Sequence, residues 1–207
     1  MGRLKRLLLP NIYHHITQRG NRRQQTFFNP TDYESYINLL RQNCIDFEVD
    51  MISFCLMPNH VHLILKSRLG SSIRDAVANT HESYTKRINF KNGWRGHLWQ
   101  GRFFSCPLSP SHLAAALNYI ALNPVRGGIC ARPEDYLWNS VHPSQIQHFS
   151  TILSVAPGNS FKIEEIENFR KASKTGQPFG DKNYFQQLEK DLEIKILRGK
   201  SGRPKKK

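Results

Sequence analysis

Two apolar segments joined by a very short turn constrain the fold of this chain more than any other feature. Residues 47–56 and 61–66 are rich in the β-branched, aromatic and aliphatic side chains that strands favour. Between them, Pro58-Asn59 is typical of a turn. Because so short a connection joins only antiparallel neighbours, the sequence predicts a tight antiparallel strand pair.

The segments on the N-terminal side of this pair add a strand and a helix. Residues 10–19 end at Gly20-Asn21, which predicts a first strand closed by a turn. Asn29-Pro30 provides a helix cap and a proline for the first turn, so we expect a helix that reaches about Asn43. One stripe of this helix is apolar and is expected to face the core: Tyr33, Tyr36, Ile37, Leu40 and Cys44.

The segments on the C-terminal side repeat the helix and the strand. Ser71-Ser72 is expected to cap a second helix that reaches about Asn89, and a short strand is expected at residues 102–108. The resulting order of strand, helix, strand, strand, helix, strand is that of the ferredoxin-like βαββαβ fold, an α+β class with an antiparallel sheet. In this fold both helices cover one face of the sheet, and the other face stays available.

A third helix is expected after Ser109-Pro110, with a buried stripe formed by Leu113, Ala116, Leu117 and Ile120. At about 100° per residue, His112, Tyr119 and Asn123 lie on a different face of this helix, so Tyr119 and Asn123 are expected to be neighbours one turn apart. Pro124 disfavours a helical conformation at Asn123, which places Asn123 at the helix end. The alternative for Tyr119 is an ordinary surface tyrosine with a half-buried ring.

Beyond residue 140 the patterns predict a helical extension and a basic tail. Short helices are expected at residues 144–156, 161–172 and 183–197. We therefore divide the chain into a main domain (1–140), a helical C-terminal extension (141–197) and a tail (198–207). The tail has six basic residues and no acidic one, and is expected to be disordered alone. Its Gly202-Arg203-Pro204 resembles the core of an AT-hook, a minor-groove-binding element, with a solvated tail as the alternative.

The charge of the chain indicates a polyanionic partner. Thirty Lys and Arg residues against 16 Asp and Glu give a net charge of +14 at neutral pH. No acidic residue occurs before Asp32, and none occurs between Ser83 and Pro133. The four cysteines form no CxxC pair, so reduced and mostly buried thiols are expected. No apolar run approaches the roughly 18 residues of a membrane span, so we expect a soluble cytoplasmic protein without membrane contact.

Residues 57–62 carry two histidines that a strand would place side by side. Side chains alternate along a strand, so His60 and His62 share one face while Val61 points to the other. Neutral histidine is the commonest metal ligand, and a strand fixes the spacing of the pair. The pair is a candidate half-site for Mg²⁺ or Mn²⁺, with Asn123 as a further polar ligand. A pair of structural histidines is the alternative.

Tyr119 is a candidate nucleophile for the same site. A tyrosine that attacks a phosphodiester keeps the bond energy in a covalent intermediate, which suits cutting and rejoining DNA rather than degrading it. A phenol has a pKa of about 10 in water, so attack at neutral pH needs a metal or basic surroundings. The acid-free stretch around Tyr119 is consistent with such surroundings.

Together these motifs resemble those of a known family. His60-Val61-His62 after Met-Pro-Asn, with Tyr119-Ile-Ala-Leu-Asn-Pro-Val-Arg126, is similar to the single-tyrosine HUH transposases, and more narrowly to the REP-associated tyrosine transposases. Further matches occur in residues 13–21, 98–103 and 134–138, so the resemblance covers about residues 10–140.

The resemblance implies a ferredoxin-like catalytic domain that nicks and rejoins single-stranded DNA beside palindromic, REP-type hairpins. By this resemblance Tyr119 attacks the backbone and becomes linked to the 5′ phosphate, while His60, His62 and Asn123 hold the metal. Larger HUH members use a carboxylate, a histidine or a glutamine as the extra ligand, so Asn123 departs from their pattern. A nucleoid-associated bacterial enzyme without a small-molecule cofactor, acting as a monomer or a homodimer, is expected.

Hairpin binding requires phosphate contacts and stacking on unpaired bases. The candidates for these contacts are basic or aromatic: Arg19, Arg22, Arg23, Lys86, Arg87, Arg95, Trp99, Arg102, His112, Arg126 and Arg203. The alternative for Trp99 is a place in the core, and for Lys86 and Arg87 it is an ordinary solvated helix face.

Two other functions stay open at this point. A catalytically inactive protein that binds DNA or RNA hairpins would use the same basic surface and keep the histidines as structural residues. A metal-dependent nuclease that activates water would cut DNA without a covalent intermediate.

Overall fold

A four-stranded antiparallel sheet in the order β2-β3-β1-β4 forms the centre of the molecule. The computed structural model describes residues 6–146 and 162–197. The strands are β1 (Tyr13–Arg19), β2 (Val49–Met57), β3 (His60–Ser67) and β4 (Phe104–Leu108). Their order along the chain, with α1 and α2 inserted, confirms the α+β, ferredoxin-like prediction.

The predicted strand pair is the hairpin of β2 and β3. Met57 pairs with His60, so the turn consists of Pro58 and Asn59 alone, and a register shift near Met51 and Ser53 is the one irregularity along this pair. Residues 61–65 of β3 are all buried, on both faces of the strand. Such a run is typical of a strand that is covered on both sides.

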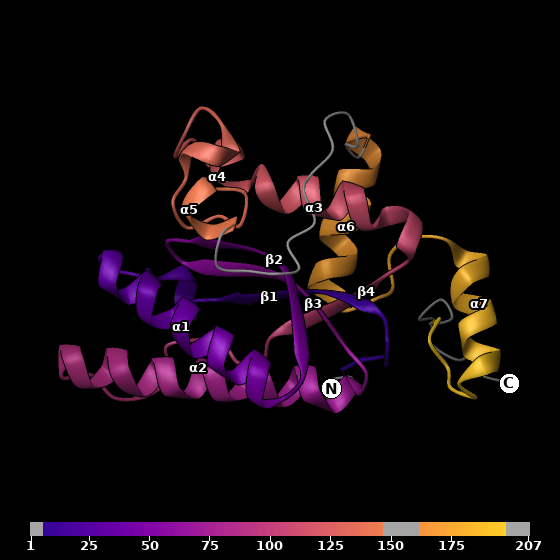
Figure 1. The fold of residues 1–207 in the computed structure, drawn as a ribbon, viewed down its shortest axis with the longest axis horizontal. Helices are drawn as coiled ribbons and strands as arrows, with labels where there is room; N and C mark the ends of the chain where they lie inside the picture. The colour runs from indigo at the N-terminus through magenta and orange to yellow at the C-terminus, as the bar shows by residue number, and fades with distance from the viewer. Residues whose placement is uncertain (1–5, 147–161, 198–207) are drawn as a thin grey trace, which may run out of the picture.

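Helices α1 (Pro30–Asp46) and α2 (Gly70–Asn92) cover one face of the sheet, as expected (Figure 1). The Asn29 side chain caps α1 by accepting from the Asp32 amide, and all the side chains of the predicted apolar stripe are buried. The predicted serine cap of α2 is wrong. Leu69 occupies that position, and no side chain caps the helix. The helix begins at Gly70, which packs tightly on Leu8, where a Cβ would lie 2.3 Å from the carbonyl oxygen.

The expectation that the second face of the sheet stays available is also corrected. Figure 1 shows α3 (Leu113–Ala121) and α6 (Ile163–Thr175) on this side of the sheet. Ala116, Leu117 and Ile120 of α3 are buried as predicted, whereas Leu113, the fourth residue of the predicted stripe, is only partly buried. From α6, Phe169 joins the same hydrophobic core. The second face is therefore largely enclosed, by elements from two distant parts of the chain.

Tyr119 and Asn123 do not share one continuous helix. His112 lies in a 3₁₀ turn (Pro110–His112) before α3, and Asn123 is the first residue of a separate short helix, α4 (Asn123–Arg126). The break follows from Pro124, which has no amide hydrogen to donate and whose ring obstructs a continuing helix. The predicted alignment of His112, Tyr119 and Asn123 on one helix face is therefore wrong.

The C-terminal extension contains α5 (Pro143–Ile146), α6 and α7 (Lys182–Asp191). Helix α7 ends six residues before the predicted boundary at residue 197. The chain turns there because the Glu189 carboxylate accepts from the amides of Ile196 and Leu197, both at 2.7 Å. Ile196 still reaches a small core with Leu9, Ile12 and Phe185. The expected helical residues 147–156 and the basic tail lie outside the described residues.

Two further 3₁₀ turns, Asn21–Arg23 and Pro133–Asp135, complete the elements. All four cysteines are free, and Cys44, Cys55 and Cys106 are buried, as predicted. Of the helices in residues 6–146 and 162–197, none combines the length and the apolar character that crossing a membrane requires.

Both edges of the sheet are covered by backbone from the second half of the chain. Along β2, the Leu56 amide donates to the Trp138 carbonyl and the Ser140 amide donates to the Phe54 carbonyl, each at 2.9 Å. Along β4, Phe179 donates to the Pro107 carbonyl at 2.9 Å and accepts from the Ser109 amide at 3.1 Å. The outer backbone groups of both edge strands are thus paired at these positions.

Candidate active site

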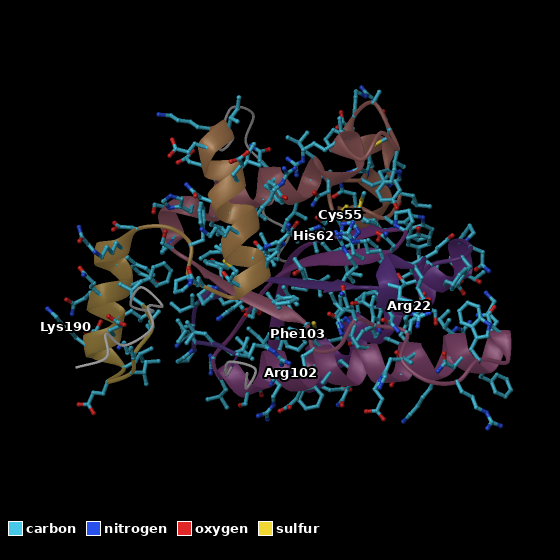
Figure 2. All side chains as sticks on the ribbon, turned by 180° about the vertical axis from the view of Figure 1, so that it is seen from behind. Arg22, Cys55, His62, Arg102, Phe103 and Lys190 are labelled. Carbon is cyan, nitrogen blue, oxygen red and sulfur yellow. The ribbon has the colours of Figure 1, made fainter. Side chains whose placement is uncertain are left out.

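His60 and His62 lie side by side on β3, on the face covered by α3 and α6. Their ring centroids are 5.0 Å apart, which agrees with the alternation of side chains along a strand. On the neighbouring strand β1, Thr17 lies opposite His62 and Arg19 lies opposite His60. The two imidazoles therefore share their face of the sheet with the Arg19 side chain. Figure 2 labels His62 on this side of the sheet.

Both imidazoles are neutral near pH 7. Burial, and then the charge of Arg19, lowers the pKa of His60 to about 4. Burial lowers the pKa of His62 well below its usual value, and His15, His60, Arg19 and Arg126 lower it further. Neutral imidazole is the form that binds a metal ion.

Each imidazole is held by one ring nitrogen. His60 donates from Nδ1 to the Asn59 side-chain oxygen at 2.6 Å. His62 Nδ1 is 2.9 Å from His15 Nε2, and His15 Nδ1 is 2.9 Å from Ser173 Oγ of α6. If His62 donates to His15 and His15 donates to Ser173, the ring nitrogens that join these three side chains are all paired. The Nε2 atoms of His60 and His62 then keep their lone pairs for a metal.

Tyr119 packs beside these histidines and is only 8% exposed. Its ring centroid is 6.4 Å from that of His62 and 4.9 Å from that of Phe169 on α6. The Arg170 Nε donates to the Tyr119 hydroxyl at 3.2 Å. The Arg126 guanidinium lies 4.0 Å from the ring centroid and also donates to the Tyr119 carbonyl. Three elements, β3, α3 and α6, therefore meet around one phenol.

Asn123 is oriented by Arg126, which donates to the Asn123 side-chain oxygen at 3.0 Å. Among the described residues, the Asn123 side-chain nitrogen is one of three buried polar side-chain atoms without a hydrogen-bond partner. A half-turn of the amide would set its NH₂ group against the Arg126 donor, so the oxygen stays where it is and keeps one lone pair beyond the bond from Arg126. Residues 6–146 and 162–197 hold no cluster of three His, Cys, Asp or Glu side chains suited to a metal. Two neutral imidazoles and one amide are thus the donors available, and they fit a metal with further ligands from substrate or water.

The structure brings two of the predicted DNA-binding residues, Arg19 and Arg126, to this site. Arg22 and Arg23 form an exposed turn at the end of β1, and both have left-handed backbone angles, with φ of 52° and 61°. The Asn59 side chain, which holds His60, also donates to the Arg23 carbonyl at 3.0 Å. The arginine turn is therefore fixed directly beside the histidine pair.

Other predicted DNA-binding residues lie elsewhere. A cavity of about 610 Å³ between α2 and residues 96–103 is lined by Arg6, Gln18, Lys86, Trp99 and Arg102, among others. Figure 2 places Arg102 and Phe103 beside α2, on the opposite side of the sheet from His62. Two exposed candidates, Arg87 and Arg95, lie on α2 and in the loop after it. Arg203 lies outside the described residues.

Three of these predictions have a structural alternative that the contacts favour. Trp99 is only 6% exposed, and its indole donates to the His81 carbonyl at 3.3 Å, which matches a core residue. Lys86 forms an exposed ion pair with Glu82 at 2.6 Å, which matches a solvated helix face. His112 bonds Ser109 at 3.0 Å and packs against Phe179. It lies before α3, away from the face predicted for it.

Sequence reasoning missed three residues that contact the site: His15, Arg170 and Ser173. His15 carries a usable signal, because alternation on the predicted first strand places it on the same face as Thr17 and Arg19. Arg170 and Ser173 carry none, since nothing in the local pattern of α6 shows which part of the sheet the helix covers.

Comparisons with known proteins show which family this chain resembles. The sequence model of the family described as "Transposase IS200 like" matches residues 9–123, more than half of the chain. A Haemophilus influenzae protein described as a REP-associated tyrosine transposase is 25% identical over 126 residues, covering 54% of this chain and 70% of its own length.

One of two solved structures supports the fold. A REP-associated tyrosine transposase bound to a REP hairpin superposes with a TM-score of 0.58 at 18% identity, covering 79% of this chain and 96% of its own. A transposase from Deinococcus radiodurans superposes with a TM-score of 0.41 at 19% identity, covering 58% of this chain and 95% of its own. The resemblance to REP-associated tyrosine transposases predicted from the sequence is thus confirmed.

Proposed function

This chain belongs to the family of IS200-like transposases, and on this premise we propose that it nicks and rejoins single-stranded DNA beside palindromic hairpins through a 5′-phosphotyrosine intermediate. One observation carries the proposal. The Tyr119 hydroxyl accepts from Arg170, and its ring lies beside the Arg126 guanidinium and the neutral imidazole of His62, whose neighbour on β3 is His60. A phenol in such surroundings is a nucleophile placed beside groups that bind a phosphodiester.

In the proposed reaction Tyr119 supplies the attacking oxygen. A bond forms between its Oη and the phosphorus, and the bond between the phosphorus and the DNA 3′ oxygen breaks. The phenol proton passes to water, and the departing 3′ oxygen takes up a proton from water. Attack by the released 3′ hydroxyl of the same or another strand reverses these steps and rejoins the DNA without ATP.

His60 and His62, with the Asn123 amide, would hold Mg²⁺ or Mn²⁺, which polarises the phosphodiester and offsets negative charge in the transition state. Asn59 and His15 orient the two imidazoles through their Nδ1 atoms. This leaves the Nε2 lone pair of each imidazole for the proposed metal.

Two observations support a hairpin as the DNA partner: the positive charge of this chain and its structural similarity to a solved relative. The net charge of +14 favours a polyanion, and the arginine turn at Arg22 and Arg23 lies next to the histidine pair. The solved relative with the TM-score of 0.58 is described as bound to a REP hairpin. We propose that the turn contacts hairpin phosphates while the single-stranded flank enters the site at Tyr119.

The test is a covalent-adduct assay. The full chain is incubated with Mg²⁺ or Mn²⁺ and labelled DNA hairpins that carry single-stranded flanks, built from palindromes beside its gene. We expect a protein–DNA adduct that survives denaturation and disappears in Tyr119→Phe. Tyr184→Phe is the matched control, because this tyrosine lies on α7 and packs against Phe185 in a separate small core.

The other outcomes separate the competing functions. Hairpin binding without any adduct would favour a catalytically inactive binding protein. Cleavage without an adduct that persists in Tyr119→Phe would favour a nuclease that activates water. An undiminished adduct in Tyr119→Phe would remove Tyr119 from the role of nucleophile.

A further inference from the structure

Helix α6 brings one charged side chain to the candidate nucleophile from outside the family match. Arg170 lies 47 residues beyond the matched segment, which ends at residue 123. Its Nε donates to the Tyr119 hydroxyl at 3.2 Å, and the residue is otherwise exposed. The two terminal nitrogens of the guanidinium therefore have donors left for a further partner.

Two more guanidiniums lie around the same phenol. Arg126 is 4.0 Å from the Tyr119 ring centroid, and Arg19 lies opposite His60 on the adjacent strand. Partial burial lowers the pKa of Arg126; Tyr119 opposes this shift, and the charge of Arg170 adds to it. The charges of Arg126 and Arg170 are thus close enough to affect each other.

These positive charges have no carboxylate partner. Within residues 6–146 and 162–197, no Asp or Glu forms an ion pair with Arg19, Arg126 or Arg170. Arginines that stabilise a fold usually pair with carboxylates, whereas uncompensated arginines around one point form an anion site. A phosphodiester is the anion that the proposed function brings to this point.

The packing of α6 does not depend on the Arg170 side chain. Phe169 is fully buried and stacks on His15 at 4.9 Å, and Ala172 and Ser173 are also buried. These three residues fix the helix to the sheet. The exposed guanidinium of Arg170 is therefore available for binding rather than needed for folding.

We propose that Arg170 and Arg126 form the binding site for the scissile phosphodiester, which makes α6 part of the active site. The proposal rests on the proposed function. The Nε of Arg170 holds the Tyr119 oxygen in line for attack, and its terminal nitrogens bind the non-bridging oxygens of the phosphate. Neither guanidinium gains or loses a proton; both stabilise the charge on the phosphate oxygens as the Oη–P bond forms and the P–O3′ bond breaks.

The test compares DNA with and without one negative charge. Affinity is measured for the full chain carrying Tyr119→Phe, so that no DNA is cut. Each linkage of the single-stranded flank is replaced in turn by a neutral methylphosphonate. Because a hydrogen bond to a charged group contributes about 10- to 100-fold, we expect one position at which the neutral linkage weakens binding by at least about tenfold.

In the double variant with Arg170→Gln, that penalty should fall by at least about threefold, because one of the two guanidiniums that bind the charge is gone and only Arg126 remains. Lys171→Gln removes the same charge from the next position of α6, where the side chain is exposed, and should leave the penalty unchanged. A penalty that is equal with and without Arg170 would overturn the proposal.

A second measurement uses the unsubstituted nucleophile. Arg170→Gln should slow adduct formation by about 100-fold, and Arg170→Lys should restore affinity more than rate, because lysine has the charge without the bidentate geometry. Adduct formation at the full rate in Arg170→Gln would also overturn the proposal. If the unsubstituted chain forms no adduct at all, the proposed function fails instead, and the methylphosphonate comparison still decides the role of Arg170.

Discussion

The two faces of the sheet differ in how their buried polar side chains are paired. On the face of α1 and α2, the Tyr84 hydroxyl donates to the Thr26 carbonyl at 2.7 Å, and the Tyr36 hydroxyl pairs with His81 at 2.9 Å. On the face of α3 and α6, His62 and Asn123 each keep one side-chain nitrogen without a partner in the described residues. Tyr36, His81 and Tyr84 are thus paired within the protein, whereas His62 and Asn123 each keep an atom that a ligand can use. Ser105, opposite Ile16 on β1, is an exception on the first face, because its buried hydroxyl has no partner among the described residues.

His14 and His15 show the same difference between adjacent residues. Both are fully buried, and burial lowers the pKa of His14 to about 4 and that of His15 to about 3. His14 accepts from the Leu9 amide and bonds the Ile12 carbonyl, so it only closes a local turn. His15 bonds His62 and Ser173 instead. Burial alone therefore does not show that a histidine belongs to the candidate active site. Its hydrogen-bond partners distinguish His15 from His14.

The largest effect is expected at the histidine pair. His60→Ala and His62→Ala should each reduce adduct formation by more than about 100-fold, because loss of even an outer partner of a metal ligand costs 10- to 100-fold. Hairpin affinity, measured by filter binding, should stay within a few-fold. His142→Ala, on the loop before α5, is the control. Full cleavage by both variants would remove these histidines from the site.

A smaller effect is expected for the residue behind the pair. His15→Phe keeps the stacking on Phe169 but removes the hydrogen bond that orients His62, so Mn²⁺ affinity should fall about 10- to 100-fold by calorimetry. Ser173→Ala removes a side chain that bonds His15 rather than His62, so it should lower Mn²⁺ affinity by less than His15→Phe does. If His15→Phe binds Mn²⁺ as tightly as the unsubstituted protein, the hydrogen bonds that join Ser173, His15 and His62 have only a structural role.

Acid should destabilise the protein through histidines on both faces. Below pH 6.5 the unfolded chain protonates its histidines, whereas folded His60 and His81 stay neutral until about pH 4 and pH 3. The unfolded state binds more protons in this window, so the free energy of unfolding falls as the pH is lowered, by about 1 kcal/mol per pH unit for each such histidine. Denaturant titrations should show a plateau above pH 6.5. A free energy that stays constant down to pH 5 would contradict the lowered pKa values.

The smallest effect separates the two faces most directly. Tyr84→Phe removes a buried hydroxyl and leaves the Thr26 carbonyl unpaired, so it should lower the free energy of unfolding by about 1–2 kcal/mol. Its adduct formation should not change. Tyr119→Phe should do the reverse. It should form no adduct, and its free energy of unfolding should fall by less than about 1 kcal/mol, because the Tyr119 hydroxyl bonds an exposed arginine. Equal stability losses in the two variants would mean that the faces do not differ in this way.

Local patterns predicted the elements well but not their contacts. The apolar stripe of α1 and the alternation at His60 and His62 depend on neighbours in the sequence, so the periodicity is enough to identify them. The hydrogen bond between His15 and Ser173 joins residues 158 positions apart, and that between Tyr119 and Arg170 joins residues 51 apart. Only the docking of α6 creates these pairs, and no local pattern encodes it.

The covered edges of the sheet have a consequence for how copies of this chain meet. An uncovered edge strand offers its backbone groups to any other strand, and two molecules can then merge their sheets. Here residues 138–140 occupy the edge of β2, and Phe179 occupies the edge of β4. Joining two molecules through either edge at these positions would first require breaking those hydrogen bonds. These contacts therefore disfavour self-association by sheet extension at these positions of the described edges.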